Sequence, residues 1–296
     1  MKRVFFIVGP TAVGKSEIAA VIAQRTKAEV LSADAFQIYR GMDLLTAKPD
    51  AATLAKAPHH LVGSMPLAEE MNVEKYRDAA EAIMANCKRM IVVGGTGLYI
   101  KALTHGLATL PAANQQLRAK LERATTEELF RSLRALDSTA AATIDRYNRR
   151  RVIRAVEVCL LTGRPFSAKR TEWKETTAAK GLLVYRDREE LYSRIDRRVE
   201  EMFAAGVVAE VRAAQEIGTT ATQMLGLREI RALIAGEISQ AECIARIQQA
   251  TRRYAKRQLT WFRRQTNFPS LNLSAHDPAE AVELVSQSAS RVFAAE

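Results

Sequence analysis

The amino-terminal sequence places the strongest constraint on how this chain can fold. Residues 9–16 fit the pattern GxxxxGK[ST], and a β-rich apolar run over residues 4–8 precedes them. Apolar residues at helical spacing follow Lys15. A strand, a glycine-rich turn and a helix in this order are typical of a phosphate-binding P-loop. The alternative is an ordinary glycine-rich strand–helix turn, which this setting disfavours. The loop consists of Gly9, Pro10, Thr11, Ala12, Val13, Gly14, Lys15 and Ser16.

The chemistry of such a loop depends on its backbone and on its last two residues. Glycines let backbone N–H groups converge on phosphate oxygens, and the amino end of the following helix adds a positive dipole. Lys15 supplies a charge for the outer phosphate, and the Ser16 hydroxyl is placed to bind Mg²⁺. We therefore expect a phosphate-bearing ligand at residues 9–16, with Mg²⁺ as the cofactor at Ser16.

The sequence after this loop alternates between strand and helix patterns. Short apolar runs at residues 30–31 and 90–93 end in polar or glycine residues, and helical patterns lie between them. This alternation predicts an α/β fold with a P-loop NTPase-like parallel sheet flanked by helices. Another short apolar run, residues 182–184, indicates a later return to the sheet.

The middle of the chain has a different pattern. Only helical patterns occur between about Pro111 and Gly163, where a glycine ends the last of them. We therefore expect an all-helical insert domain. The expected division is a catalytic core of residues 1–110 and 170–296, with the insert over residues 111–169.

Capping motifs predict where three helices begin. Thr125 with Glu128 fits a capping box, and so does Ser239 with Glu242. Asp187 precedes a stripe of apolar residues at helical spacing, so we expect its side chain to cap that helix.

One residue that a P-loop NTPase needs is missing. Such an enzyme has an Asp at the end of an apolar strand, where it holds Mg²⁺, but residues 90–93 lead into Gly94-Gly95-Thr96-Gly97. The acid at a suitable strand end is Asp34. Because the carboxyl ends of parallel strands face the ligand crevice, Asp34 is expected beyond the P-loop phosphates. There it can accept a proton from an attacking group; the alternative is that it only caps a turn.

The charge of the chain bears on its partner. Lys and Arg number 44 against 33 Asp and Glu, a formal net charge of +11. This excess favours RNA, DNA or an anionic membrane surface, and the alternative is a merely basic soluble protein. Two basic clusters on helical patterns suit a sugar–phosphate backbone, although either one alone is also typical of a solvated helix face. They comprise Arg146, Arg149, Arg150, Arg151 and Arg154, and Arg252, Arg253, Lys256, Arg257, Arg263 and Arg264.

Cysteine usage and hydropathy indicate the compartment. Cys87, Cys159 and Cys243 lie far apart without a CxxC pair, so we expect reduced, mostly packed cysteines. The apolar run at residues 4–8 leads into a glycine loop instead of a signal-peptide cleavage site, and no later run is long enough to span a bilayer. We expect a cytoplasmic protein that does not contact membranes.

Together these residues resemble the tRNA dimethylallyltransferase family, also called tRNA isopentenyltransferases. The similarity extends from the P-loop to about Arg264. The motifs that carry it are GPTAxGKS at residues 9–16, SADxFQxYRGMD at 32–43, TAKP at 46–49, PHHL at 58–61, GGTGLY at 94–99, NxxRVxRAxEV at 148–158 and KRQxTWFR at 256–263.

The resemblance implies a prenyl transfer to tRNA. Members of the family transfer a dimethylallyl group from its diphosphate to N6 of adenosine 37, next to the tRNA anticodon, and release diphosphate. The P-loop would then hold a diphosphate that shares Mg²⁺ with Ser16, which would account for the missing strand-end Asp. The implied partners are the tRNA anticodon stem-loop and dimethylallyl diphosphate, and we expect the enzyme to be a monomer.

The resemblance also implies roles for individual residues. Asp34 would accept the N6 proton, and Thr96 would hold the flipped adenosine. Lys15 and Arg212 would take up charge on the leaving diphosphate. The implied tRNA contacts are Asp34, Ala35, Phe36, Gln37, Thr96, Arg118, Arg150, Arg151, Val152, Ile153, Arg154, Gln223, Met224, Leu225, Gly226, Leu227, Arg228, Lys256, Arg257, Gln258, Trp261 and Arg263.

The chain departs from the family's pattern at two places. Ala35 stands where the family often has Ser, which removes one polar contact. Residues 145–149 read Asp-Arg-Tyr-Asn-Arg, where the family usually shows a His and a Pro before the Asn and an Asp after it. The second departure concerns the local geometry of the insert and not the reaction.

Two rival functions share parts of this pattern. An ATP-dependent kinase of a small metabolite would carry the same loop and sheet, and it predicts ATP turnover without RNA. A non-catalytic RNA-binding protein with a relic P-loop predicts RNA binding that survives the loss of Asp34 and Lys15. Either rival would leave no prenylated product.

Overall fold

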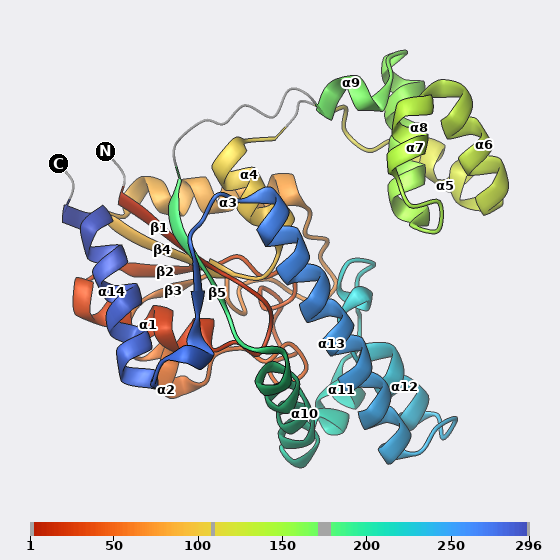
Figure 1. Ribbon diagram of the computed structural model, residues 1–296. Helices are drawn as coiled ribbons and strands as arrows, with labels where there is room; N and C mark the ends of the chain where they lie inside the picture. Colours follow the sequence, from red (N-terminus) through yellow and green to blue (C-terminus); the bar gives the residue numbers. More distant parts are fainter. Residues whose placement is uncertain (1–2, 108–109, 171–178, 295–296) are drawn as a thin grey trace. The chain divides into compact units, whose positions relative to one another are not determined.

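The computed structural model of the chain describes residues 3–107, 110–170 and 179–294. They form two compact units, one of residues 1–104 with 178–296 and one of residues 105–177 (Figure 1). The insert expected over residues 111–169 lies wholly within the second unit, whose limits fall further out at both ends. The two units are described separately below.

The larger unit is built on a six-stranded sheet in which all pairs of neighbours are parallel, as the strand–helix alternation predicts. Its order is β3-β2-β4-β1-β5-β6. The two shortest strands, β3 and β6, were not expected from the sequence. The strands are β1 (Arg3–Val8), β2 (Glu29–Ser32), β3 (His59–His60), β4 (Arg89–Gly94), β5 (Lys180–Tyr185) and β6 (Ser270–Asn272).

The register of the sheet brings three loops together at one edge. Val8 at the end of β1 pairs with Gly94 at the end of β4, and Ser32 at the end of β2 pairs with Val93. The chain segments that follow these strands are the P-loop, the Gly94–Gly97 turn and the segment that begins at Ala33. Because parallel strands end at a common edge, the topology places the expected phosphate site and Asp34 side by side.

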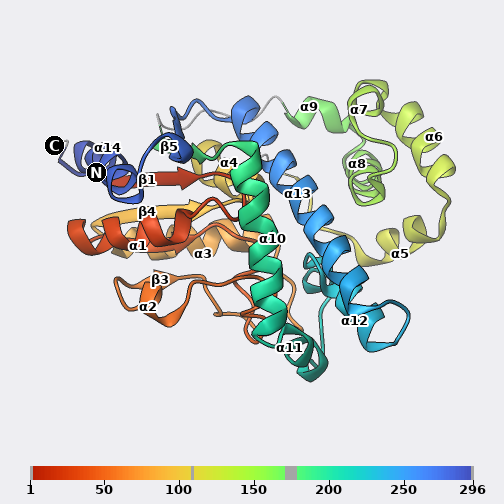
Figure 2. The same cartoon turned by 60° about the horizontal axis from the view of Figure 1, so that its bottom comes forward.

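Both faces of the sheet are covered, which explains why its strands are continuously apolar. Side chains alternate along β1, so Phe5 and Ile7 pack on one face and Phe6 and Val8 on the other. The first face carries α1 (Lys15–Thr26), α2 (Ala51–Leu54) and α14 (Pro278–Ala294), and the second carries α3 (Val73–Asn86) and α4 (Gly97–His105) (Figures 1 and 2).

A group of helices late in the chain completes the larger unit. The helix α10 packs against the long helix α13, α11 packs against α10, and α12 packs against both α11 and α13 (Figure 2). Val199 and Met202 of α10 and Phe262 of α13 join one core of the sheet, so these helices are anchored close to it. Their bounds are α10 (Arg188–Ala204), α11 (Val207–Ala213), η1 (Ala221–Gln223), α12 (Leu227–Ile234) and α13 (Gln240–Gln265).

The smaller unit contains helices only, among its described residues, as the sequence pattern predicts. Leu129 and Leu133 pack against Val152, Ile153 and Val156 in a core of its own. The capping box at Thr125 is present, and the last long helix ends in the left-handed Gly163 with φ of +63°. Its helices are α5 (Gln115–Arg123), α6 (Thr126–Leu136), α7 (Ser138–Thr143), α8 (Arg149–Thr162) and α9 (Phe166–Arg170).

Two of the predicted caps differ from expectation. Asp187 does stand at the N-cap of α10, but its side chain does not cap the helix and instead accepts a hydrogen bond from Asn272 Nδ2 at 3.0 Å. Ser239 caps α13 by accepting from the backbone N–H of Glu242 at 3.2 Å. The Glu242 carboxylate binds Arg246 at 2.6 Å, so the reciprocal half of this capping box is absent.

The cysteines and the hydropathy of the helices agree with the sequence analysis. All three cysteines are free thiols; Cys159 and Cys243 are buried, and Cys87 is half-buried. Within the described ranges, none of the helices combines the length and the apolar character needed to cross a membrane.

Candidate active site

The P-loop connects β1 to α1 and forms one wall of a cavity. Gly14 is the N-cap of α1 with φ of +100°, a conformation that favours glycine, and Ala12 is also left-handed with φ of +63°. The cavity has a volume of about 360 Å³. The loop residues that line it are Thr11, Ala12, Gly14, Lys15 and Ser16.

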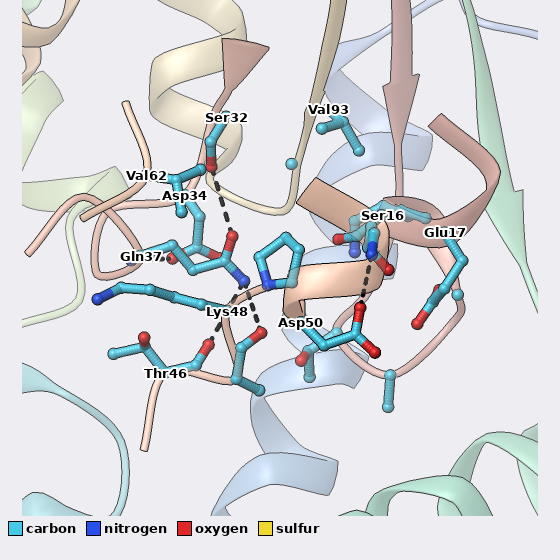
Figure 3. A pocket seen from close by; sticks show the side chains of 18 of the residues that line it. Ser16, Glu17, Ser32, Asp34, Gln37, Thr46, Lys48, Asp50, Val62 and Val93 are labelled. Carbon is cyan, nitrogen blue, oxygen red and sulfur yellow. Dashed lines mark hydrogen bonds between the residues drawn. The ribbon is translucent and has the colours of Figure 1, made fainter. Parts of the chain in front are cut away.

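The other walls of this cavity come from distant parts of the chain. The carboxyl end of β2 contributes Ser32 and Asp34, the segment over residues 46–50 adds a further wall, and α10 adds charged side chains. In Figure 3, Asp34 lies on the opposite side of the cavity from Ser16. The α10 residues that line the cavity are Arg194, Arg197, Arg198 and Glu201.

Lys15 is half-buried within this site. Its Nζ donates a hydrogen bond to the backbone oxygen of Pro10 at 2.6 Å. Burial lowers the pKa of Lys15 to about 8, although the nearby Asp34 carboxylate acts in the opposite direction and Arg198 adds to the lowering. A group that has lost its hydration in this way gains strongly from an anionic ligand.

Two arginines of α10 hold the P-loop from outside. Arg194 Nε donates to the backbone oxygen of Ala12 at 2.9 Å, and Arg198 donates to Oγ1 of Thr11 at 3.2 Å. Burial lowers the pKa of Arg198, and Asp34 opposes this shift. Arg198 is therefore a positive group inside the site, directed at the same loop that carries Lys15.

Arg212, which was expected to meet the diphosphate, does not lie here. It is exposed on α11 and lines neither this cavity nor the second one described below. Arg198 of α10 lines this cavity beside the P-loop, whereas the sequence analysis expected Arg212 there. The sequence offered little sign of this, because the pattern of α10 is dominated by the apolar stripe of Leu191, Ile195, Val199 and Met202.

Asp34 and Thr96 lie next to each other at the edge of the sheet. Asp34 Oδ1 accepts hydrogen bonds from the backbone N–H groups of Phe36 at 2.9 Å and Gln37 at 3.3 Å. Asp34 thus caps a turn, as one alternative held, and it also lines the cavity, as the other held. Thr96 Oγ1 accepts from the backbone N–H of Ala35 at 3.0 Å, which joins the β2 and β4 loops.

A second, smaller cavity of about 80 Å³ begins where the first one ends. Both cavities are lined by Thr11, Asp34, Thr46 and Arg198. The rest of its lining is mostly apolar or aromatic: Phe36, Leu45, Ile195, Val199, Met202, Met224, Leu225, Ile247, Thr251 and Tyr254. A polar, cationic cavity and an apolar cavity therefore meet at one carboxylate. Sequence analysis did not find the second cavity, because its apolar side chains are indistinguishable from core residues.

The residues expected to contact RNA in the larger unit divide into two classes. Lys256, Arg257 and Arg263 of α13 are exposed, and Arg228 of α12 has 90% of its side chain exposed. Gly226 is the N-cap of α12, Gln223 is exposed, Trp261 is half-buried, and Leu225 lines the second cavity. Three of the expected contact residues have buried side chains: Met224, Leu227 and Gln258.

The same division holds within the helical unit. Arg150 and Arg151 are exposed, but Val152 and Ile153 belong to the core of the unit and present no side chain to RNA. The other two expected contacts, Arg118 and Arg154, both bind the carboxylate of Glu157, whose side chain is fully buried, at 3.0 and 2.7 Å. Hydrogen bonds from these arginines and from a backbone N–H outweigh the effect of burial and lower the pKa of Glu157.

One group of three side chains in the described part of the chain has the chemistry to bind a metal ion: Glu29, His60 and Cys87. The Glu29 carboxylate lies 2.6 Å from His60 Nε2. Burial and the nearby carboxylate raise the pKa of the Cys87 thiol to about 11. None of the three lines either cavity, so this cluster takes no part in the site.

The chain is similar to known proteins over most of its length. A family model described as IPP transferase matches residues 37–265. The tRNA dimethylallyltransferase 1 of Citrifermentans bemidjiense is 42% identical over 271 residues, which are 88% of this chain and 89% of the relative.

Two solved structures are also similar. The tRNA isopentenylpyrophosphate transferase of Bacillus halodurans has a TM-score of 0.72 and 31% identity, covering 99% of this chain and 97% of its own. A eukaryotic dimethylallyltransferase, studied acting on tRNA, has a TM-score of 0.80 and 26% identity, covering 98% of this chain and 78% of its own. The extent of these matches shows that the chain belongs to the IPP transferase family, whose curated bacterial relatives are named tRNA dimethylallyltransferases.

Proposed function

We propose that this protein transfers a dimethylallyl group from dimethylallyl diphosphate to N6 of adenosine 37, beside the tRNA anticodon, and releases diphosphate. The observation that carries the proposal is the meeting of a cationic cavity and an apolar cavity at Asp34. The diphosphate needs a cationic environment and the allylic group and the purine need an apolar one, and the two must be in contact.

The cationic cavity suits the diphosphate of the donor. A P-loop offers backbone N–H groups and the amino end of its helix, here α1, to a phosphate, and Lys15 and Arg198 add two half-buried positive groups. As the bond between the allylic carbon and the diphosphate oxygen breaks, negative charge develops on the leaving group. Fixed cations that are already desolvated stabilise that charge without reorganisation.

The apolar cavity suits the dimethylallyl group and the adenine base. Phe36, Met224 and Tyr254 supply aromatic and apolar surface there. An adenine stacked in an anticodon loop cannot reach such a place, so the base must be flipped into it. The exocyclic amine is a poor nucleophile, and it must lose a proton as the new C–N bond forms.

We assign the acceptance of that proton to Asp34. It lines both cavities, and its turn hydrogen bonds fix the carboxylate where the two meet. The Thr96 hydroxyl accepts a hydrogen bond from the backbone N–H of Ala35, the residue after Asp34, and can hold the flipped base. In the proposed reaction the amine attacks the allylic carbon, the proton passes to Asp34, and the electron pair of the breaking C–O bond leaves with diphosphate.

The residues near the P-loop fit Mg²⁺. Ser16 lines the cavity together with Glu17, Asp34 and Asp50, so the available donors are hydroxyl and carboxylate oxygens. Mg²⁺ prefers such oxygen ligands and commonly binds through one or two of them together with substrate phosphates. Ser16 is the residue that would hold it. When bound, Mg²⁺ would neutralise part of the charge on the departing diphosphate.

The RNA partner is supported by the exposed basic residues of α12 and α13 and by those of the helical unit. They suit the phosphate backbone of a stem-loop, with affinity that falls as salt rises. A cytoplasmic, monomeric enzyme is part of the same proposal.

One assay separates this function from its two rivals. The protein is incubated with Mg²⁺, dimethylallyl diphosphate and an anticodon stem-loop that contains the target adenosine, and the RNA is then weighed. The proposal predicts that one dimethylallyl group replaces one hydrogen. ATP hydrolysis without RNA would instead favour the kinase. Bound RNA of unchanged mass would favour the non-catalytic binding protein.

A further inference from the structure

The inward face of α13 carries three side chains directed at the site. Tyr254, Gln258 and Trp261 are four and three residues apart, so they lie on one side of the helix. Tyr254 lines the apolar cavity, Gln258 is only 6% exposed, and Trp261 is half-buried. The same helix presents Lys256, Arg257 and Arg263 to solvent, so its two faces differ in chemistry.

Gln258 joins two loops that follow different strands. Its Oε1 accepts a hydrogen bond from the backbone N–H of Thr11 at 2.9 Å, and its Nε2 donates to the backbone oxygen of Gly95 at 2.9 Å. Thr11 belongs to the P-loop after β1, and Gly95 belongs to the turn after β4. A carboxamide can both accept and donate, which neither a carboxylate nor a thioether can do at neutral pH.

The turn after β4 is shaped to admit α13. A Cβ atom at Gly95 would lie 2.2 Å from Gln258 Nε2, and one at Gly97 would lie 2.4 Å from the Trp261 ring. Glycine at both positions therefore lets the helix approach the turn closely. Independently of the hydrogen bonds, this close approach indicates that the contact between α13 and the turn is part of the site.

What Gln258 holds in place is the position of Thr96 relative to the P-loop. Thr96 follows Gly95 directly, its backbone N–H donates to Ala33 at 3.1 Å, and its hydroxyl accepts from Ala35. Fixing Gly95 thus fixes the Thr96 side chain and the segment that carries Asp34. Fixing Thr11 at the same time sets the phosphate-binding loop against them.

We propose that Gln258 is a positioning residue, which aligns the diphosphate-binding loop with the Thr96–Asp34 pair and does not itself contact RNA. The proposal rests on the function proposed above for the two cavities. It separates Gln258 from its neighbours Lys256 and Arg257, which share its sequence motif but face solvent.

The test compares four variants. Gln258→Met removes both hydrogen bonds at nearly constant volume, and Gln258→Glu keeps the acceptor for Thr11 but turns a carboxylate towards the Gly95 oxygen. Gln265→Met is the matched control, because Gln265 is exposed at the end of the same helix and its Oε1 accepts a hydrogen bond from Lys101 Nζ at 2.9 Å, away from both cavities. Lys256→Ala tests the outer face.

We expect Gln258→Met and Gln258→Glu to raise the KM for dimethylallyl diphosphate about tenfold to a hundredfold, since each leaves a buried backbone group without its partner. Affinity for the anticodon stem-loop should stay within about twofold of the parent, because the side chain is buried. Lys256→Ala should instead weaken the binding of the stem-loop and leave the KM for dimethylallyl diphosphate unchanged. Gln265→Met should change neither quantity. A simple loss of folded protein would lower kcat and leave KM unchanged, so the KM shift reports positioning.

Binding of inorganic diphosphate with Mg²⁺, measured by calorimetry without RNA, makes this test independent of transfer. If no transfer occurs at all, the proposed function fails, while weaker diphosphate binding by Gln258→Met would still support the role of Gln258. Parent-like diphosphate affinity in Gln258→Met would overturn the positioning role. So would a loss of RNA affinity as large as that of Lys256→Ala.

Discussion

The guanidinium of Arg198 donates a hydrogen bond to the hydroxyl of Thr11, which places a cation from α10 directly on the P-loop. The two residues are 187 positions apart in sequence, and only the fold brings them together. Their contact is at the junction of the two cavities, which both residues line. In the proposed reaction, Arg198 would therefore complement Lys15 on the leaving diphosphate.

This contact predicts that Arg198, and not Arg212, binds the donor. Arg198→Ala should raise the KM for dimethylallyl diphosphate about tenfold to a hundredfold, because a charged hydrogen-bond donor to the diphosphate is lost. Arg212→Ala is the matched control and should stay within about twofold of the parent, since Arg212 is exposed on α11. Steady-state kinetics with varied donor measure both. The reverse order of effects would return the role to Arg212.

Asp34→Asn should abolish most of the turnover without affecting RNA binding. Asparagine keeps an oxygen that can accept the turn hydrogen bonds from Phe36 and Gln37, so the local structure should persist. It cannot accept the N6 proton, and the loss of a general base lowers kcat by about a hundredfold to ten-thousandfold. Single-turnover kinetics and a filter-binding assay of the stem-loop give the two quantities. Undiminished turnover would remove Asp34 as the base.

Loss of the proton from Lys15 should lower kcat/KM for dimethylallyl diphosphate at alkaline pH. Its pKa is lowered to about 8 by burial, so the ammonium is present below that pH and is lost above it. A bound diphosphate favours the charged form and raises this pKa, so binding near pH 8 takes up a proton. The ratio kcat/KM for dimethylallyl diphosphate should therefore fall about tenfold per pH unit above 8.

The control for this pH effect is Lys15→Arg, because a guanidinium stays charged throughout the range. The kcat/KM of this variant should be lower than that of the parent. Between pH 8 and 9.5, however, it should not fall tenfold per pH unit. Calorimetry of diphosphate binding in two buffers of different ionisation enthalpy counts the proton directly. A parent enzyme with the same kcat/KM across this range would show that Lys15 does not titrate here.

We expect the buried carboxylate of Glu157 to stabilise the helical unit. Its buried carboxylate binds Arg118, Arg154 and the backbone N–H of Asn114 at 3.0, 2.7 and 2.9 Å. Glu157→Gln should lower the free energy of unfolding by about 2 kcal/mol, less than for a fully buried pair, because the arginines are partly exposed. Native-state hydrogen exchange of α5 and α8 amides measures it.

Because its pKa is lowered in the folded state, Glu157 also contributes stability that is lost as pH falls through that value. The matched control is Glu127→Gln, which removes an exposed partner of Arg146 and should leave exchange unchanged. Equal exchange rates in the parent and in Glu157→Gln would contradict the structural role of this network.

The comparison of sequence and structure separates local from non-local information. The P-loop, the central parallel strands and the Thr125 capping box were predictable, because each is specified by residues that are close in sequence. The strands β3 and β6 were not, since two or three residues carry no usable periodicity and only their neighbours define them. The capping box at Ser239 lacks its second hydrogen bond, because the Glu242 carboxylate binds Arg246 one turn later instead.

The candidate site shows the same limit. Asp34 could be placed from strand order alone, whereas the choice between Arg198 and Arg212 depends on which turn of which helix faces the cavity. Val152 and Ile153 lie within an arginine-rich motif but are core residues, which their apolar character indicated. Gln258 lies within a basic motif as well, and its burial against the P-loop is visible only in three dimensions.

The central claim is that a diphosphate and an adenosine amine react where the two cavities meet at Asp34. The most direct measurement is a count of products after a reaction of stem-loop RNA, dimethylallyl diphosphate and Mg²⁺. Diphosphate is assayed in solution, and the RNA is digested to nucleosides. We predict one diphosphate released for each N6-dimethylallyladenosine formed at the position next to the anticodon, and a formation of both products that is at least about a hundredfold slower with Asp34→Asn. Diphosphate released without modified adenosine, or modification of another base, would contradict it.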